Sequence, residues 1–282
     1  MPVLDEKFKM SPKYNWYSKI LRGIFKIRRN KLFPPKPISD RDIFSMAEAG
    51  KKLVIQVFNG GLGDHLVYSA LPELLWKQKQ IKVYISTRSV FRNQQIWDFV
   101  WGRNPYAAFT DDNGWYIHRP LPFHEECKTV NAYLMRLFHL DADDSPRIYY
   151  RPQVISLLEG KTVIDASFGP SGRANGYFEK VFLQKFINYI RQNVGDFVLL
   201  KYSNVKYENP LQMELVKCFS PQIAIVDSIE RLCDVLASAQ KRYLMYSGSA
   251  SVSAALKLES VVLCNRCSCE NFKYSINSYI KL

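Results

Sequence analysis

The chain has 282 residues, of which 47% are hydrophobic and 23% are charged, and this composition excludes a fibrous or disordered protein and predicts a buried core. Its 39 lysines and arginines exceed its 26 aspartates and glutamates, which gives a formal net charge of +13. The sequence contains neither an apolar run of about 18 to 20 residues, the length of a membrane-spanning helix, nor a signal-peptide pattern. We therefore expect a cytoplasmic protein.

The six cysteines do not predict disulfide bonds, because they are unevenly spaced in a chain that is long enough to bury a core without them. Three of them, Cys264, Cys267 and Cys269, lie close together, as the ligands of some metal sites do. A structural zinc site needs four ligands, and no histidine follows at a suitable distance. We expect neither a metal ion nor a cofactor.

The first 39 residues form a basic segment. Residues 9–38 contain no acidic residue and many lysines and arginines, while Trp16, Ile20, Ile24 and Ile27 recur at helical spacing. This pattern predicts a basic amphipathic helix that ends before two prolines. It favours attachment to an anionic membrane surface, where each nearby cation adds about 1 kcal/mol. The alternatives are a helix packed on the protein body, or nucleic acid, for which no recognition motif is present and which we do not expect as a partner.

Residues 40–150 show alternating strand and helix patterns. Apolar, β-branched runs predict strands over residues 52–58 and 82–86, and helical periodicity predicts helices over residues 66–78 and 131–140. A parallel sheet covered by helices follows from this alternation. We expect this region to be one Rossmann-like domain.

A second alternating region follows over residues 160–265. Its predicted strands are 161–167, 196–202, 222–226, 242–246 and 260–264, and its predicted helices are 178–192, 229–239 and 250–256. The polar stretch 141–159 is the predicted connector. Residues 266–282 are a C-terminal tail, and we expect its aromatic and polar part, residues 271–282, to pack back across the first domain. The predicted fold is therefore α/β, with two doubly wound Rossmann-like domains facing a central ligand cleft at the carboxyl ends of their strands.

The most informative motif is a glycine turn, residues 59–65, with the sequence Asn-Gly-Gly-Leu-Gly-Asp-His. It lies between a predicted strand and a predicted helix, where glycines let a backbone or a ligand approach closely. It is not a dinucleotide fingerprint, because Leu66 stands where the third glycine belongs, and it lacks the Lys-Ser/Thr pair of a phosphate-binding loop.

Asp64 is the candidate catalytic group of this turn. A carboxylate in the first turn of a helix is held ionised by the helix dipole, which suits a residue that must take a proton from a hydroxyl. The alternative is that Asp64 caps the helix and that the glycines serve only the turn. His65 follows directly and is a second candidate, as a group that assists Asp64.

The stretch 58–74, Phe-Asn-Gly-Gly-Leu-Gly-Asp-His-Leu-Val-Tyr-Ser-Ala-Leu-Pro-Glu-Leu, resembles the opening signature of the bacterial heptosyltransferases, glycosyltransferase family nine. Residues 162–190 are similar to the strand, nucleotide-sugar loop and helix of that family. Residues 228–263 are similar to its closing part, which contains a Ser-Gly turn and an alanine-rich helix. The resemblance covers residues 50–265 in the same order.

This resemblance implies the two-domain GT-B fold and an inverting transfer of sugar from a nucleotide-sugar donor to a glycan or glycolipid acceptor in a bacterial surface glycan. Asp64 matches the proposed general base of the family, and enzymes of this kind usually need no metal. An inverting transfer needs one carboxylate for the acceptor proton while the nucleotide diphosphate leaves from the opposite face of the sugar. A lipid-linked acceptor would place the protein on the inner face of the cytoplasmic membrane.

The resemblance also implies where the donor binds, and leaving phosphates need positive partners and helix N-terminal N–H groups. The candidate donor-binding residues are Gly61, Gly63, Gly169, Ser171, Arg173, Lys201, Ser247, Gly248, Ser249 and Ser251.

Two positions depart from the family pattern, since Tyr246 stands in place of an aspartate and Ser251 in place of a histidine. Two alternatives therefore stay open. Besides the transferase that acts on a glycan, the chain could be a non-catalytic nucleotide or polyanion binder with the same fold, or a transferase that glycosylates protein.

Overall fold

The structure is a computed structural model, and it describes residues 45, 49–50, 52–115, 129–169, 176–203, 209–265 and 272–282. The described residues belong to one compact unit, Asp40–Leu282. The predicted basic helix within residues 1–39 lies outside them. Of the helices that are described, none is both long and apolar enough to cross a bilayer.

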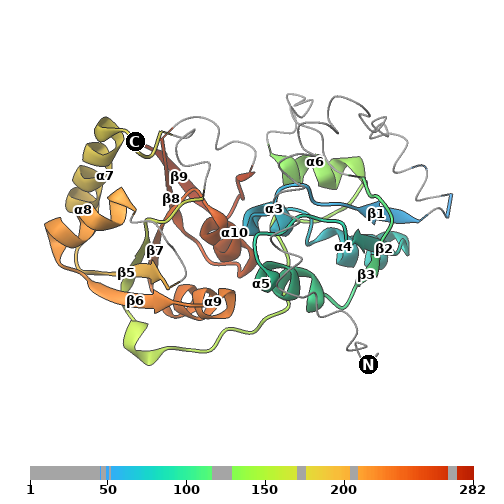
Figure 1. The fold of residues 1–282 in the computed structure, drawn as a ribbon, viewed down its shortest axis with the longest axis horizontal. Helices are drawn as coiled ribbons and strands as arrows, with labels where there is room; N and C mark the ends of the chain where they lie inside the picture. Colours follow the sequence, from blue (N-terminus) through green and yellow to red (C-terminus); the bar gives the residue numbers. More distant parts are fainter. Residues whose placement is uncertain are drawn as a thin grey trace, which may run out of the picture. The chain divides into compact units, whose positions relative to one another are not determined.

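The first sheet consists of three parallel strands, β1 (Leu53–Ile55), β2 (Val83–Ser86) and β3 (Ala107–Thr110), in the order β1-β2-β3 (Figure 1). The first two confirm the predicted strands. The strand β3 was not predicted, because its sequence, Ala-Ala-Phe-Thr, is short and lacks β-branched residues until its last position. Beyond β1, Trp115 forms an isolated parallel bridge with Ile55.

Helices α3 (Leu62–Leu66), α4 (Leu71–Lys79), α5 (Gln94–Trp97) and α6 (Val130–Leu137) accompany this sheet, and α5 continues as the π-helix η2 (Asp98–Gly102). The helix predicted over residues 131–140 is confirmed, whereas the single helix predicted over 66–78 is wrong. That segment is divided between α3 and α4, and Pro72 lies in the first turn of α4. Proline has no N–H to donate and is tolerated only in the first turn of a helix, so a new helix begins there.

The second sheet has six parallel strands in the order β6-β5-β4-β7-β8-β9. They are β4 (Thr162–Asp165), β5 (Phe197–Tyr202), β6 (Gln222–Val226), β7 (Lys241–Met245), β8 (Val261–Cys264) and β9 (Ser278–Lys281). Because the chain runs outward from β4 in one direction and then returns to build the other side, the sheet is doubly wound. The first five strands confirm the predicted ones.

Helices α7 (Lys180–Asn193) and α8 (Pro210–Phe219) lie on one face of this sheet, and α9 (Ile229–Ser238) and α10 (Gly248–Ala255) on the other (Figure 1). Successive strand residues alternate between two hydrophobic clusters, as Val163 and Ile164 do on β4. The cluster beneath α9 and α10 continues into the core of the first sheet, so a single apolar core joins the two sheets. The helix α8 was not predicted, although Asn209 caps it and Pro210 opens it.

The C-terminal segment, residues 272–282, was expected to pack across the first domain, residues 40–150. Its Ser275 hydroxyl does donate to Asp144 of that region at 2.7 Å, but the segment also joins the second sheet. Its strand β9 pairs in parallel with β8 at the edge of the second sheet. The side chain of Asn277 donates to the carbonyl of Ala250 on α10 at 3.2 Å. Tyr279 and Ile280 are residue types that favour strands, and the open edge of β8 supplies the partner.

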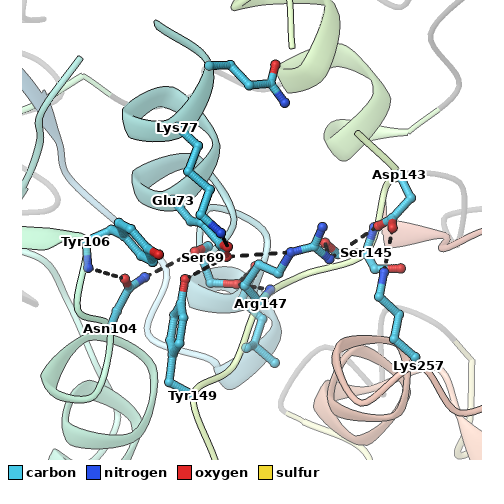
Figure 2. Close-up of polar contacts among 12 residues, drawn as sticks. Ser69, Glu73, Lys77, Asn104, Tyr106, Asp143, Ser145, Arg147, Tyr149 and Lys257 are labelled. Atoms are coloured by element: carbon cyan, nitrogen blue, oxygen red, sulfur yellow. Dashed lines mark hydrogen bonds and ion pairs between the residues drawn. The ribbon is translucent and has the colours of Figure 1, made fainter. Parts of the chain in front are cut away.

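The connector, residues 141–159, contains no strand and only a short 3-10 turn, η3 (Ser156–Leu158). Figure 2 shows its Arg147 between Glu73 of α4 and Asp143, with Lys257 on the far side of Asp143. Tyr149 donates to Glu73 at 2.9 Å, and Lys257 of the second half pairs with Asp143 at 2.7 Å. Polar contacts thus hold the connector to both halves.

The pair between Asp143 and Lys257 predicts an acid-dependent contribution to stability. Burial raises the pKa of Asp143, but the hydrogen bonds from Lys257 and from the Ser145 backbone and the charge of Arg147 lower it from 3.8 to about 2. The stabilisation is therefore full above about pH 4 and is lost as the pH falls toward 2. Because the two side chains are 49% and 45% exposed, solvent screening limits it to at most about 1 kcal/mol.

Thermal unfolding of the wild type and of Asp143→Asn between pH 7 and pH 2 measures this effect. The difference in stability should be constant at neutral pH and vanish near pH 2. Asp141→Asn, which changes an exposed carboxylate of the same connector, is the control and should show no such difference. A difference between wild type and Asp143→Asn that is independent of pH would contradict the prediction.

Candidate functional site

The glycine turn packs directly against the backbone of the loop that follows β2. The Arg92 N–H donates to the Gly60 carbonyl at 2.9 Å. A Cβ atom on Gly60 would lie 3.0 Å from the Arg92 nitrogen and 3.1 Å from the Phe91 carbonyl carbon. A side chain here would push on backbone atoms, which do not move easily, so this position favours glycine.

Asp64 lies in the first turn of α3 and is half-buried. Its Oδ2 accepts a hydrogen bond from the Gly61 N–H at 3.2 Å. The structure therefore confirms that Asp64 caps the helix, the alternative that the sequence left open. Because the carboxylate is only half-buried, this contact is compatible with a role in proton transfer.

His65 points into the core and is 0% exposed. The Trp101 indole N–H donates to its Nδ1 at 2.8 Å, so Nε2 carries the proton and lies 2.9 Å from the Val90 carbonyl. Burial lowers the pKa of His65 to about 4, and the bond to Val90 offsets only part of this effect. Both ring nitrogens are engaged, which does not fit the prediction that His65 assists Asp64. The ring instead joins α3 to η2 and to the loop after β2.

Helix α3 contacts α10 of the second half through two glycines. A Cβ atom on Gly63 would lie 3.3 Å from the Ser251 hydroxyl and 3.9 Å from the Cα of Gly248. A Cβ atom on Gly248 would lie 3.3 Å from the Cβ of Leu62. The contact thus brings Gly63 beside the serine turn, residues 247–251, and Asp64 follows Gly63 in the chain.

The serine turn is held by a buried carboxylate that the sequence analysis missed. Asp165, at the carboxyl end of β4, is 1% exposed and accepts hydrogen bonds from the Ser167 backbone and hydroxyl and from Tyr202 of β5 at 2.8 Å. Burial raises its pKa, against the lowering effect of hydrogen bonds from Ser167, Ser249 and Tyr202. The signal was present, because an aspartate that closes an apolar strand lies at the sheet edge where α/β proteins bind ligands.

The two positions that depart from the family pattern both contact the C-terminal segment. The Tyr246 hydroxyl accepts from the Phe272 N–H at 3.0 Å. The Tyr274 hydroxyl donates to Ser251 at 3.2 Å, and both of these side chains are buried. Ser249 and Ser247 share a hydrogen bond at 2.9 Å. The side chain of Ser251 is thus used for packing inside the protein.

Gly169 lies in the loop after β4 and is close to a residue of the first half that was not predicted. A Cβ atom on Gly169 would lie 3.2 Å from Nη1 of Arg92, and one on Gly61 would lie 3.3 Å from Nη2. The structure therefore brings Gly61 and Gly169 together through the Arg92 guanidinium. No sequence pattern marks Arg92, because only the folded chain brings its loop to Gly169.

Lys201 is exposed on β5, and its side chain points to the opposite face from Tyr202, which bonds to Asp165. Within the described part of the chain, no hydrogen bond or ion pair joins Lys201 to the serine turn. Ser171 and Arg173 lie outside the described residues, and their roles stay predictions.

Among the described residues, no cluster of three or more His, Cys, Asp or Glu side chains has the arrangement of a metal site. Cys264 is buried, and its thiol donates to the Ile280 carbonyl at 3.6 Å. Cys267 and Cys269 lie outside the described residues.

The burial of His65 predicts a pH-dependent loss of stability. Its pKa is about 4 in the folded chain and 6.5 in the unfolded chain, so between these values the unfolded state binds more protons. Stability therefore falls as the pH drops from about 6.5 to about 4, by about 3 kcal/mol in total.

Chemical denaturation of wild type and His65→Asn over this range measures the effect. The variant should be the less stable at pH 7, and the difference should shrink as the pH approaches 4. His139→Asn, which removes an exposed ring, should keep the wild-type pH dependence. If the free energy of unfolding changed with pH equally in wild type and His65→Asn, His65 would not be a buried, neutral residue.

Comparison with known proteins gives matches among solved structures alone. No family model matches the sequence, and no curated protein matches it. Two structures of the heptosyltransferase TibC are similar. One, in complex with ADP-D-β-D-heptose, has a TM-score of 0.54 and 13% identity over 80% of this chain and 61% of that chain. The other, from enterotoxigenic E. coli H10407, has a TM-score of 0.56 and 13% identity over 82% and 63%.

A glycosyltransferase of family 9 from Veillonella parvula is similar over 82% of this chain and 85% of that chain, with a TM-score of 0.50 and 11% identity. The chain spans less than two thirds of the TibC chains that it matches. Both TibC proteins are described as dodecameric and iron-containing. The chain therefore has the α/β fold with parallel sheets that is found in heptosyltransferases of the GT-B type.

Proposed function

We propose that this protein is a glycosyltransferase that moves a sugar from a nucleotide-sugar donor to a glycan acceptor. The observation that carries the proposal is the meeting of the glycine turn and the serine turn in a chain of this fold. Asp64, half-buried at the first turn of α3, lies one residue from Gly63, which contacts Gly248 and Ser251. Asp64 thus follows a residue that contacts the turn after β7, and ligands of doubly wound sheets bind at the carboxyl ends of the strands.

In this proposal the transfer inverts the anomeric centre and Asp64 is the base. The acceptor hydroxyl gives its proton to the carboxylate as its oxygen attacks the anomeric carbon, and the nucleoside diphosphate leaves from the opposite face with the bonding electrons. The bond to the Gly61 N–H orients the carboxylate in advance. His65 holds the turn in place from inside the core.

The second half would hold the donor. Asp165 links the carboxyl ends of β4 and β5 through Ser167 and Tyr202, and Ser249 lies beside it. This arrangement fixes Ser167, just after β4, and the start of α10. The first half would then hold the acceptor, in a ligand cleft between two domains with the boundaries that the sequence predicts.

The acceptor and the cellular location rest on the sequence alone. The basic amphipathic pattern within residues 1–39 supports binding to the anionic inner face of the cytoplasmic membrane. A protein held there meets lipid-linked glycans or lipooligosaccharide precursors, which are the acceptors that we propose. The protein would then be a bacterial peripheral membrane enzyme.

A non-catalytic nucleotide binder is the second candidate. It is favoured by the use of Tyr246 and Ser251 for contacts with the C-terminal segment, since these side chains stand where the family pattern has an aspartate and a histidine. Nucleotide binding without transfer would support this candidate, whereas transfer to any acceptor would exclude it.

Nucleotide binding is the first property to measure. Thermal shifts of the purified protein with ADP, GDP, UDP, CMP and their sugar conjugates, ADP-heptose included, should show selective stabilisation by one nucleotide. A ligand at 100 times its dissociation constant stabilises a protein by about 2.7 kcal/mol. Cooperative unfolding with no shift for any compound would contradict the proposed donor site.

Asp64→Asn should then lower the rate of transfer by roughly 10²- to 10⁴-fold, the usual contribution of a general base, and leave nucleotide binding unchanged. Asparagine can still accept from the Gly61 N–H, so the fold should be preserved. Asp111→Asn, a change of an exposed aspartate, is the matched control and should be fully active. An active Asp64→Asn protein would remove Asp64 from the mechanism.

A further inference from the structure

We propose that the guanidinium of Arg92 binds a phosphoryl oxyanion between the glycine turn and the loop at Gly169. The assignment of this oxyanion to the donor diphosphate rests on the proposed function, whereas the presence of an oxyanion site does not. Arg92 belongs to the first half, and it lies in the loop that follows β2.

Hydrogen bonds fix the backbone of Arg92 and of the loop around it. The Arg92 N–H donates to the Gly60 carbonyl at 2.9 Å. Two residues earlier, the Val90 N–H donates to the Val57 carbonyl at 2.7 Å, and the Val90 carbonyl lies 2.9 Å from Nε2 of His65. The loop is therefore attached to the glycine turn on both sides of Phe91. A guanidinium that starts from a fixed backbone loses less conformational freedom when it binds a ligand.

Two glycines leave the space that the guanidinium fills. A Cβ atom on Gly169 would lie 3.2 Å and 3.4 Å from its two terminal nitrogens, and a Cβ atom on Gly61 would lie 3.3 Å from Nη2. The two shorter distances are tighter than ordinary van der Waals contacts, so a Cβ atom at either position would shift the guanidinium by a few tenths of an ångström. A Cβ atom on Gly61 would also lie 2.7 Å from Oδ2 of Asp64. The slot thus has one wall from each half of the protein.

Within the described ranges, the Arg92 guanidinium has no carboxylate within ion-pair distance and no hydrogen-bond acceptor. Other arginines do have such partners. Arg103 pairs with Glu230, Arg147 with Glu73 and Asp143, and Arg88 donates to Asn113. Arg92 is exposed, although it stands in a slot built of glycines. A planar fork of donors held in this way matches a phosphoryl group, which accepts two parallel hydrogen bonds.

The position suits the leaving group of the proposed reaction. Gly61, which adjoins Nη2 of Arg92, also bonds to the Asp64 carboxylate. The positive charge thus stands between the proposed base and the loop that follows β4, where negative charge develops on the departing diphosphate. An arginine from the acceptor half would place its charge on the donor only when both halves are in contact.

The test uses Arg92→Gln in the full chain and isothermal titration with three probes: the nucleoside diphosphate selected by the thermal shifts, inorganic pyrophosphate and inorganic phosphate. Loss of a charge-assisted, two-point contact should weaken binding of the diphosphate and of pyrophosphate by roughly tenfold to a hundredfold. Arg92→Lys keeps the charge but loses the planar pair of donors, so its affinity for these ligands should lie between those of the wild type and Arg92→Gln. Arg88→Gln, an equal change of charge in the same loop, should bind as the wild type does.

Gly169→Ala gives a second variant that leaves Arg92 itself in place. The added Cβ would displace the guanidinium and should weaken the binding of the diphosphate and of pyrophosphate. Gly195→Ala is its control, because a Cβ there meets nothing within 4 Å.

Each outcome decides between the two proposals. Equal diphosphate and pyrophosphate affinities in wild type and Arg92→Gln would overturn the oxyanion site and leave the donor site standing. Arg92-dependent binding of pyrophosphate or phosphate, without binding of any nucleotide, would support the oxyanion site and contradict the proposed donor. A wild-type protein that binds none of the probes would overturn both.

Discussion

The contact between α3 and α10 exists because neither helix carries a side chain at Gly63 or Gly248. Any larger residue would press on Ser251 or on Leu62, at distances of 3.3 Å. The glycine turn and the serine turn can therefore touch, and everything proposed for the site depends on that proximity. The same absence of side chains at Gly61 and Gly169 makes room for Arg92.

Some polar groups around this contact hold the structure in position, and others are exposed to a substrate. His65 and Asp165 are buried and fully engaged by neighbours, so they hold the turns and the strand ends in position. Asp64 and Arg92 have accessible surface. Opposite charges of accessible groups beside a rigid, buried frame are the arrangement expected of a site that binds a polar substrate.

The sequence predicted the elements whose patterns are strong. Apolar periodicity predicted both sheets except for β3 and β9, and it predicted the helices of the second half except for α8. The division of residues 66–78 follows from Pro72, whose effect outweighs the helical spacing around it. The contacts that make the site were beyond prediction from local patterns, because Arg92 meets Gly169 and Tyr274 meets Ser251 only after distant segments come together. A glycine motif indicates close approach but not the residue that approaches.

The placement of the C-terminal segment, residues 272–282, has a consequence for synthesis of the protein on the ribosome. Tyr274 supports Ser251 under the start of α10, and Ser251 in turn faces Gly63 of α3. The glycine turn therefore emerges from the ribosome long before the residues that support its partner. Contacts between segments so distant in sequence form late, and a nascent chain that has completed its first sheet still lacks the site until residues 272–282 have been made.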